Sequence, residues 1–178
     1  MRIIGNNPNF AGENGNLIAT KIEEDWFFSG KAFAFEDYFL FATDEVKTFV
    51  FDPTNCDCDK IVNFPITLYS TSGPIIVDIY IGTLSADDGT LLQPINRKFG
   101  GDPPKSTIRL NSTIQDLGLR IGGDIVPGTG LNPQTSTGGS NTGILPLELN
   151  KNFKNTLSVY NANGAGVYLV TKFTWFEV

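Results

Sequence analysis

The stretch IIVDIYIGTLSADDGTLLQPINRKFG, residues 75–100, decides the fold class of this chain. Its first half alternates, so that one side of an extended chain would carry Ile75, Val77, Ile79 and Ile81, and the other Ile76, Asp78 and Tyr80. A period of two is typical of a half-buried β-strand. Residues 87–90 (DDGT) have the composition of a tight turn, in which Gly89 takes a positive φ. We therefore predict a strand, a reversal and a returning segment that resumes its apolar character at Leu91.

The same alternation recurs from Ser29 onward. Faces of further strands are predicted at Phe33, Phe35, Phe39 and Phe41; Phe49 and Phe51; Val62, Phe64, Ile66 and Leu68, with Pro65 at an edge or bulge; Ile108 and Leu110; Leu117, Leu119 and Ile121; Leu145, Leu147 and Leu149; Leu157 and Val159; and Val167, Leu169, Phe173 and Trp175. These are about eight to ten short strands. No long stretch has a helical period, so the sequence predicts an all-β, jelly-roll-like sandwich.

At 178 residues the chain fits one domain with a full core. Residues 1–28 are predicted to form an extended N-terminal arm, because this stretch is rich in Asn and Gly and carries few apolar anchors. Residues 29–178 would form the sandwich. The arm either packs on its own domain or is held by a partner. Residues 122–143 would form the longest irregular loop, and loops of that length are often contact loops.

Charge and hydropathy narrow the classes of partner. The net charge is −6, so the long-range field repels phosphate backbones, and we expect no nucleic-acid partner. No apolar run is long enough for a membrane span or an export signal, so we expect no membrane association. Cys56 and Cys58 are one residue apart, a spacing that in an extended chain rarely suits a disulfide. We therefore expect free thiols, as in a reducing cytoplasm.

The residue types present leave little for catalysis. The chain has no His, which removes the common nucleophile systems and the commonest zinc ligand. The carboxylate clusters at 23–25 and 87–88 show no spacing typical of an acid–base pair, so solvated turns are the favoured interpretation. Asn55, Asp57 and Asp59 alternate like calcium ligands, but Lys60 and Ile66 occupy the places that need Gly and Glu. We expect no cofactor, no metal and no enzymatic activity.

Aromatic residues offer one alternative function. Trp26, Trp175, Tyr80 and Tyr160 could form a platform for sugar rings. Aromatic side chains on strands usually belong to the core, however, and we favour that interpretation, with Trp175 on the buried face of the closing strand and Trp26 beneath the arm.

Several short blocks together resemble a group of small tailed-phage virion proteins. The blocks are Gly89-Thr90-Leu91-Leu92, Asn96-Arg97, the Gly/Thr-rich loop at 122–143, Leu145-Pro146-Leu147, Val159-Tyr160-Asn161 and the closing FTWFE at 173–177. The similarity spans roughly residues 30–178. These relatives are auxiliary capsid proteins, also called decoration or cement proteins, and some are jelly rolls that trimerise on the head.

The resemblance implies a non-enzymatic protein, made in the host cytoplasm, that stabilises the exterior of the virion capsid as a homotrimer. Its partners would be the major capsid protein and further copies of itself. The candidate contact residues are Ile3, Ile4, Asn7 and Phe10 in the arm, Arg97, and Asn132 and Thr135 in the long loop. Asn96 is expected to bond to backbone, whereas the Arg97 fork can join a carboxylate across a subunit boundary. A carbohydrate- or receptor-binding module of a head fibre or tail is the alternative, and an enzyme acting on polysaccharide is the least favoured.

Overall fold

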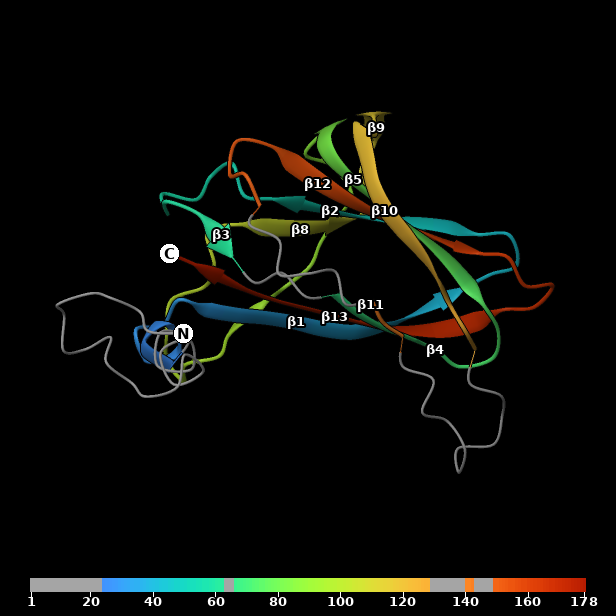
Figure 1. The fold of residues 1–178 in the computed structure, drawn as a ribbon, viewed down its shortest axis with the longest axis horizontal. Coiled ribbons are helices and arrows are strands. Elements are labelled where there is room, and N and C mark those ends of the chain that lie inside the picture. Colours follow the sequence, from blue (N-terminus) through green and yellow to red (C-terminus); the bar gives the residue numbers. More distant parts are fainter. Residues whose placement is uncertain (1–23, 63–65, 129–139, 143–148) are drawn as a thin grey trace, which may run out of the picture.

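The computed structural model describes residues 24–62, 66–128, 140–142 and 149–178. Two antiparallel sheets face each other and curl into a sandwich (Figure 1). A single helical turn at residues 24–28 precedes the first strand, and the Lys31 amide bonds to the Trp26 carbonyl where that turn ends. The predicted all-β fold is confirmed.

Each sheet is a continuous ladder of hydrogen-bonded strands. The first sheet runs in the order β11 (Ser140–Thr142), β4 (Ile66–Ser70), β13 (Val167–Glu177), β1 (Ala32–Phe41) and β7 (Ile95–Asn96), with β3 (Ile61–Val62) also beside β13. The second runs in the order β10 (Leu119–Val126), β5 (Ile75–Ser85), β12 (Lys154–Asn161), β2 (Val46–Asp52), β8 (Thr107–Leu110) and β6 (Thr90–Leu91), with β9 (Ile114–Asp116) beside β5.

The strand pairing is that of a jelly roll. β1 pairs with β13, β2 with β12, β4 with β11 and β5 with β10, so the chain is a long folded ribbon whose early strands meet its late ones. Each of these four pairs lies within one sheet, and winding the ribbon places them in two facing sheets. The strand pairing therefore agrees with the predicted jelly-roll-like sandwich.

The core fills the space between the two inner faces. Phe33, Phe35 and Phe41 of β1 point inward, and so do Phe49 and Phe51 of β2, as the alternation predicts. The inner side of β5 carries Ile75, Val77 and Ile79, and β13 contributes Val167, Leu169, Phe173 and Trp175. Edge-on and tilted aromatic pairs join the two sheets, among them Phe39 with Phe49, whose ring centroids lie 5.2 Å apart. Burial of these rings is the main term that holds the sandwich together.

The segment after β5 does not return along it, and this part of the prediction is wrong. Gly89 has the expected positive φ of 79°. However, β6 pairs with β8 at the far edge of the sheet, with β12, β2 and β8 lying between β5 and β6. Residues 86–90 therefore cross the sheet, and Asp88 fixes them by accepting hydrogen bonds from the Thr113 amide and hydroxyl, both at 2.6 Å.

Residues 86–118 form an insertion between β5 and β10 that extends both sheets. β8 adds to the second sheet beside β2, while β7 adds to the first sheet beside β1. The insertion therefore runs along one edge of the sandwich and joins its two layers there. It also carries Arg97 to the outer side of the first sheet.

Some predicted faces differ from the structure. Ile61, rather than Val62, is buried in β3, and β4 lies between two strands instead of at an edge. Residues 122–126 continue β10, and 140–142 form β11, so both ends of the predicted long loop are strands. Phe64 and Pro65, Leu145 and Leu147, and the middle of that loop lie outside the described residues.

Candidate interaction surface

The outer face of the first sheet carries side chains that the core does not use. Strand alternation turns every second residue of β1 and β13 away from the core. The outward pairs, set by the register of the two strands, are Ala34 with Thr174, Glu36 with Lys172, Tyr38 with Val170, and Leu40 with Tyr168. This face therefore has a charged pair in its middle and an apolar patch toward the end of β1.

The apolar patch consists of Tyr38, Leu40 and Tyr168, which we call the outer tyrosine patch. These side chains are 70%, 55% and 48% exposed, respectively. Tyr38 and Leu40 are two residues apart on one strand, and Tyr168 lies directly opposite Leu40 on the next. Exposed aromatic residues grouped on a rigid sheet are typical of contact surfaces, since Tyr is enriched in protein interfaces.

A pocket of about 310 Å³ opens at the other end of the same face, beside β7. Ala34, Glu36, Lys172 and Thr174 line it from β1 and β13, and Gln93, Ile95 and Arg97 line it from the insertion. We call it the Arg97 pocket. Ile95 lies opposite Ala34 in the β1–β7 register and is 66% exposed. The pocket is therefore a polar hollow with an apolar rim.

Charges in the Arg97 pocket do not balance. Lys172 Nζ lies 3.3 Å from Glu36 Oε2. The Arg97 guanidinium lies 5.5 Å from the centre of the Phe27 ring, a cation–π contact, and makes no hydrogen bond to any other residue that the structure describes. Two cations thus line the pocket with one carboxylate, and Arg97 is exposed.

Backbone hydrogen bonds hold Arg97 at this position. The Arg97 amide donates to the Ala32 carbonyl at 2.9 Å. Asn96 Nδ2 donates to the carbonyls of Gly30 and Asp102, both at 2.8 Å, and Asn96 Oδ1 accepts from the Lys98 amide. The predicted structural role of Asn96 is confirmed. The side chain of Asn96 ties β7 to the start of β1, so the Arg97 guanidinium projects from a fixed backbone.

β10 exposes a second set of apolar side chains. Leu119 and Ile121, which the sequence analysis assigns to a strand face, are 67% and 41% exposed, and Ile125 is 61% exposed. Arg120 interrupts them with an ion pair to Asp78 at 2.6 Å. Residues 119 and 121 are therefore strand residues, as predicted, but they do not belong to the buried core.

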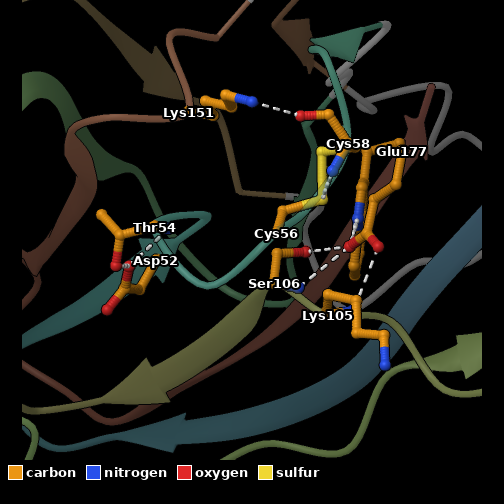
Figure 2. Close-up of a disulfide and its surroundings, with 9 residues drawn as sticks. Asp52, Thr54, Cys56, Cys58, Lys105, Ser106, Lys151 and Glu177 are labelled. Atoms are coloured by element: carbon orange, nitrogen blue, oxygen red, sulfur yellow. Dashed lines mark hydrogen bonds between the residues drawn. A yellow bond between two sulfur atoms is a disulfide. The ribbon is translucent and has the colours of Figure 1, made fainter.

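The cysteines form a disulfide, so the expectation of free thiols is wrong (Figure 2). The chain is not extended there: the Cys56 amide bonds to the Pro53 carbonyl in a turn, and the Cα atoms of Cys56 and Cys58 are only 5.2 Å apart. That separation falls inside the usual disulfide range and is shorter than the span of two steps along an extended strand, about 6.6 Å. Cys56 is buried, and Lys151 donates to the Cys58 carbonyl at 2.7 Å, so the bridge closes one end of the core.

The aromatic residues considered as a sugar platform do not come together. Trp175 is fully buried, which confirms its predicted place in the core. Trp26 packs on the opposite side of β13, 5.2 Å from the Phe176 ring. Tyr160 donates its hydroxyl to Asp44 Oδ1 at 3.0 Å. Any sugar contact would have to use other residues.

Two of the carboxylates considered for catalysis, Asp87 and Asp88, have structural partners. Asp87 Oδ1 pairs with Lys154 Nζ at 2.6 Å, and Asp88 holds Thr113. Within residues 24–62, 66–128, 140–142 and 149–178, no group of three or more His, Cys, Asp or Glu side chains is placed to hold a metal ion. Asp57 and Asp59 line an open pocket of about 380 Å³ beside the disulfide, together with Lys31 and Lys105.

Acid is expected to destabilise the protein by protonating Asp87 and Asp88 in residues 86–90, the segment that crosses the second sheet. The hydrogen bonds from Thr113 hold the pKa of Asp88 below its usual range, and the hydrogen bond from Lys154 does so for Asp87. The unfolded chain takes up these protons near pH 4, and the folded chain only at lower pH. The stabilisation that these two carboxylates contribute is therefore fully present above about pH 4, and it is lost as the pH falls through their pKa values in the folded chain. Thermal unfolding between pH 2 and 7 should show this loss, and Asp88→Asn should flatten the profile, whereas an unchanged profile would contradict it.

Of the predicted contact residues, the structure describes only Arg97. It lies at the pocket, exposed and without a described hydrogen-bond partner for its guanidinium. Ile3, Ile4, Asn7, Phe10, Asn132 and Thr135 lie outside the described residues. Sequence reasoning missed Glu36, Lys172 and the outer tyrosine patch. The sequence did contain a signal for them: they are the residues of β1 and β13 that alternate with the inward ones, and the same period of two identified the inward phenylalanines.

No helix in the described ranges is long and apolar enough to cross a membrane. Comparison with protein-family models, with characterised proteins and with solved structures finds no match to this chain.

Proposed function

We propose that this chain is a non-enzymatic structural protein of a phage virion, which decorates and stabilises the outer face of the capsid as a trimer. The observation that carries the proposal is the outer tyrosine patch on the first sheet. Its three exposed side chains lie on the side of the sheet that faces away from the core, so the sandwich does not need them for packing. They suit a contact with a flat protein surface, here the major capsid protein.

The net charge of the chain and the energetics of lattice binding support this proposal. A net charge of −6 suits a position outside the shell, where no contact with packaged nucleic acid is needed. A ligand that binds only the assembled lattice stabilises it by mass action, about 2.7 kcal/mol per site at a hundredfold excess over its dissociation constant. A trimer adds avidity, so each single contact can be weak.

The test uses heads that lack the protein. Purified protein is mixed with these heads, and bound protein is measured by co-sedimentation together with DNA release on heating. The double variant Tyr38→Ser/Leu40→Ser should weaken binding at least about tenfold, since interface aromatics often contribute 1.4 kcal/mol or more. Ile125→Ser is the matched control, because it removes a comparably exposed apolar side chain from the other sheet. Equal binding of all three proteins, or no binding at micromolar protein, would contradict the proposal.

The second candidate is a carbohydrate- or receptor-binding module. The same exposed tyrosines favour it, because Tyr38 and Tyr168 are exposed aromatic side chains on which a sugar ring could pack. Binding to cell-surface glycans or tails, lost in Tyr168→Ser, together with no binding to heads would replace the capsid assignment with this one.

A further inference from the structure

We propose that the Arg97 pocket binds a carboxylate side chain from a second copy of this chain, so that each subunit completes the pocket of its neighbour. This inference rests on the proposed function, in which the chain forms a trimer, and it assigns the contact that joins the subunits. It concerns the pocket beside β7, whereas capsid binding is assigned to the outer tyrosine patch at the other end of the face.

The donors in the pocket suit a carboxylate. The Arg97 fork can give two parallel hydrogen bonds to such a group, the geometry that makes Arg–carboxylate pairs strong. Lys172 is 45% exposed, and its one ion pair among the described residues is the 3.3 Å contact with Glu36, so it can donate to an incoming group as well. Gln93 and Thr174 add neutral polar atoms to the wall. A volume of about 310 Å³ has room for an aspartate or glutamate side chain.

An acidic sugar suits the pocket less well. The pocket's lining includes one aromatic residue, Phe35, and its side chain is buried in the core. Among the described residues that line the pocket, a bound sugar ring would therefore find no exposed aromatic face. The exposed Ile95 at the rim fits an apolar surface around the carboxylate, as a neighbouring protein provides.

The charge of the chain makes another copy a suitable source of the carboxylate. The sequence has 19 acidic and 13 basic residues, so copies repel one another at long range and present carboxylates on approach. Association therefore needs a local attraction that offsets this repulsion. A pocket with two cations and one carboxylate is locally positive and attracts a carboxylate of another copy. A pocket on one surface that receives a side chain from a different surface makes a heterologous contact, which can close into a ring such as a trimer.

Self-association of variants provides the first test. Sedimentation equilibrium of the whole chain should give an oligomer that weakens with added salt. Arg97→Ala should weaken it at least about tenfold, and Arg97→Lys by less, because Lys keeps the charge but loses the fork. Lys98→Ala is the matched control: it removes an adjacent exposed cation that does not line the pocket. Thermal unfolding of each variant checks that the monomer remains folded.

Cross-linking identifies the incoming group. A carbodiimide joins Lys to carboxylates that touch it, so a mixture of ¹⁵N-labelled and unlabelled protein should give mixed-isotope peptides that link Lys172 to an Asp or Glu. Links to Glu36 within one chain carry a single isotope and are thereby separated.

Each remaining outcome overturns the inference. A wild-type chain that stays monomeric, an Arg97→Ala variant that assembles like wild type, or glucuronic acid binding that depends on Arg97 in a monomer would do so. Co-sedimentation with heads is scored separately, so a monomer that still binds heads through the outer tyrosine patch would refute this contact and leave the proposed capsid role standing.

Discussion

Trp175→Ala is expected to lower the free energy of unfolding by about 3–5 kcal/mol, the usual loss when a large buried aromatic residue is truncated. Trp175 is fully buried, and it joins the two layers of the sandwich. Its ring lies 5.8 Å from that of Phe33 on β1, in its own sheet, and 5.5 Å from that of Phe51 on β2, in the facing sheet. Alanine would leave a cavity between the sheets and remove the contacts that Trp175 makes with both rings.

Such a loss is a large part of the 5–15 kcal/mol by which domains are usually stable. For a chain of this size it corresponds to a fall in melting temperature of about 10 °C. Urea unfolding followed by tryptophan fluorescence and circular dichroism measures it. Phe176→Ala is the control, because Phe176 is the next residue on the same strand but packs on the outside against Trp26. A loss under 1 kcal/mol for Trp175→Ala, or a larger one for the control, would contradict the assignment of Trp175 to the centre of the core.

The sequence alone predicted the inner faces well, because a half-buried strand repeats every two residues and the phenylalanines of β1 and β2 keep that period. It did not predict which strands pair. Residues 87–90 show the composition of a turn, but composition does not say whether the chain returns to its neighbour or crosses the sheet, and here an insertion carries it across. The cysteine prediction failed for a related reason: it assumed an extended chain where a turn brings the two residues together.

Surface assignments were weaker still. Leu119 and Ile121 have the apolar character of core residues, yet they are exposed, because β10 lies at the edge of the second sheet and its register with β5 shifts between Arg120 and Gly122. Arg97 was singled out through the resemblance, in which Asn96-Arg97 is one of the blocks. The outward set of the alternation places Glu36 and Lys172 on strand faces but not beside Arg97, because they lie 61 and 75 residues away along the chain and meet it only when β7 pairs with β1.

Glu177→Ala is the second substitution with a large expected effect, because one buried carboxylate there serves four donors (Figure 2). Its oxygens accept from the amides of Lys105 and Ser106 at 3.0 Å, from the Ser106 hydroxyl at 2.5 Å and from the Trp175 indole at 3.3 Å. Each buried donor left without an acceptor costs about 1–3 kcal/mol. The expected loss in unfolding free energy is therefore about 3 kcal/mol or more.

Because of its position, Glu177 is also expected to hold the insertion in place, so the substitution should affect local structure as well as the free energy of unfolding. Residues 105 and 106 end the connection from β7 to β8, so the carboxylate fastens the insertion to the last strand of the sandwich. Losing it should expose the amides of residues 105 and 106 to hydrogen exchange, and should also loosen β7, which carries Arg97. Glu36→Ala is the matched control: it removes a carboxylate that is 59% exposed and ion-paired on the surface, where such pairs contribute about 0–1 kcal/mol. Equal stability of the two variants, with unchanged exchange at 105 and 106, would show that the insertion is held by its own strands and not by this carboxylate.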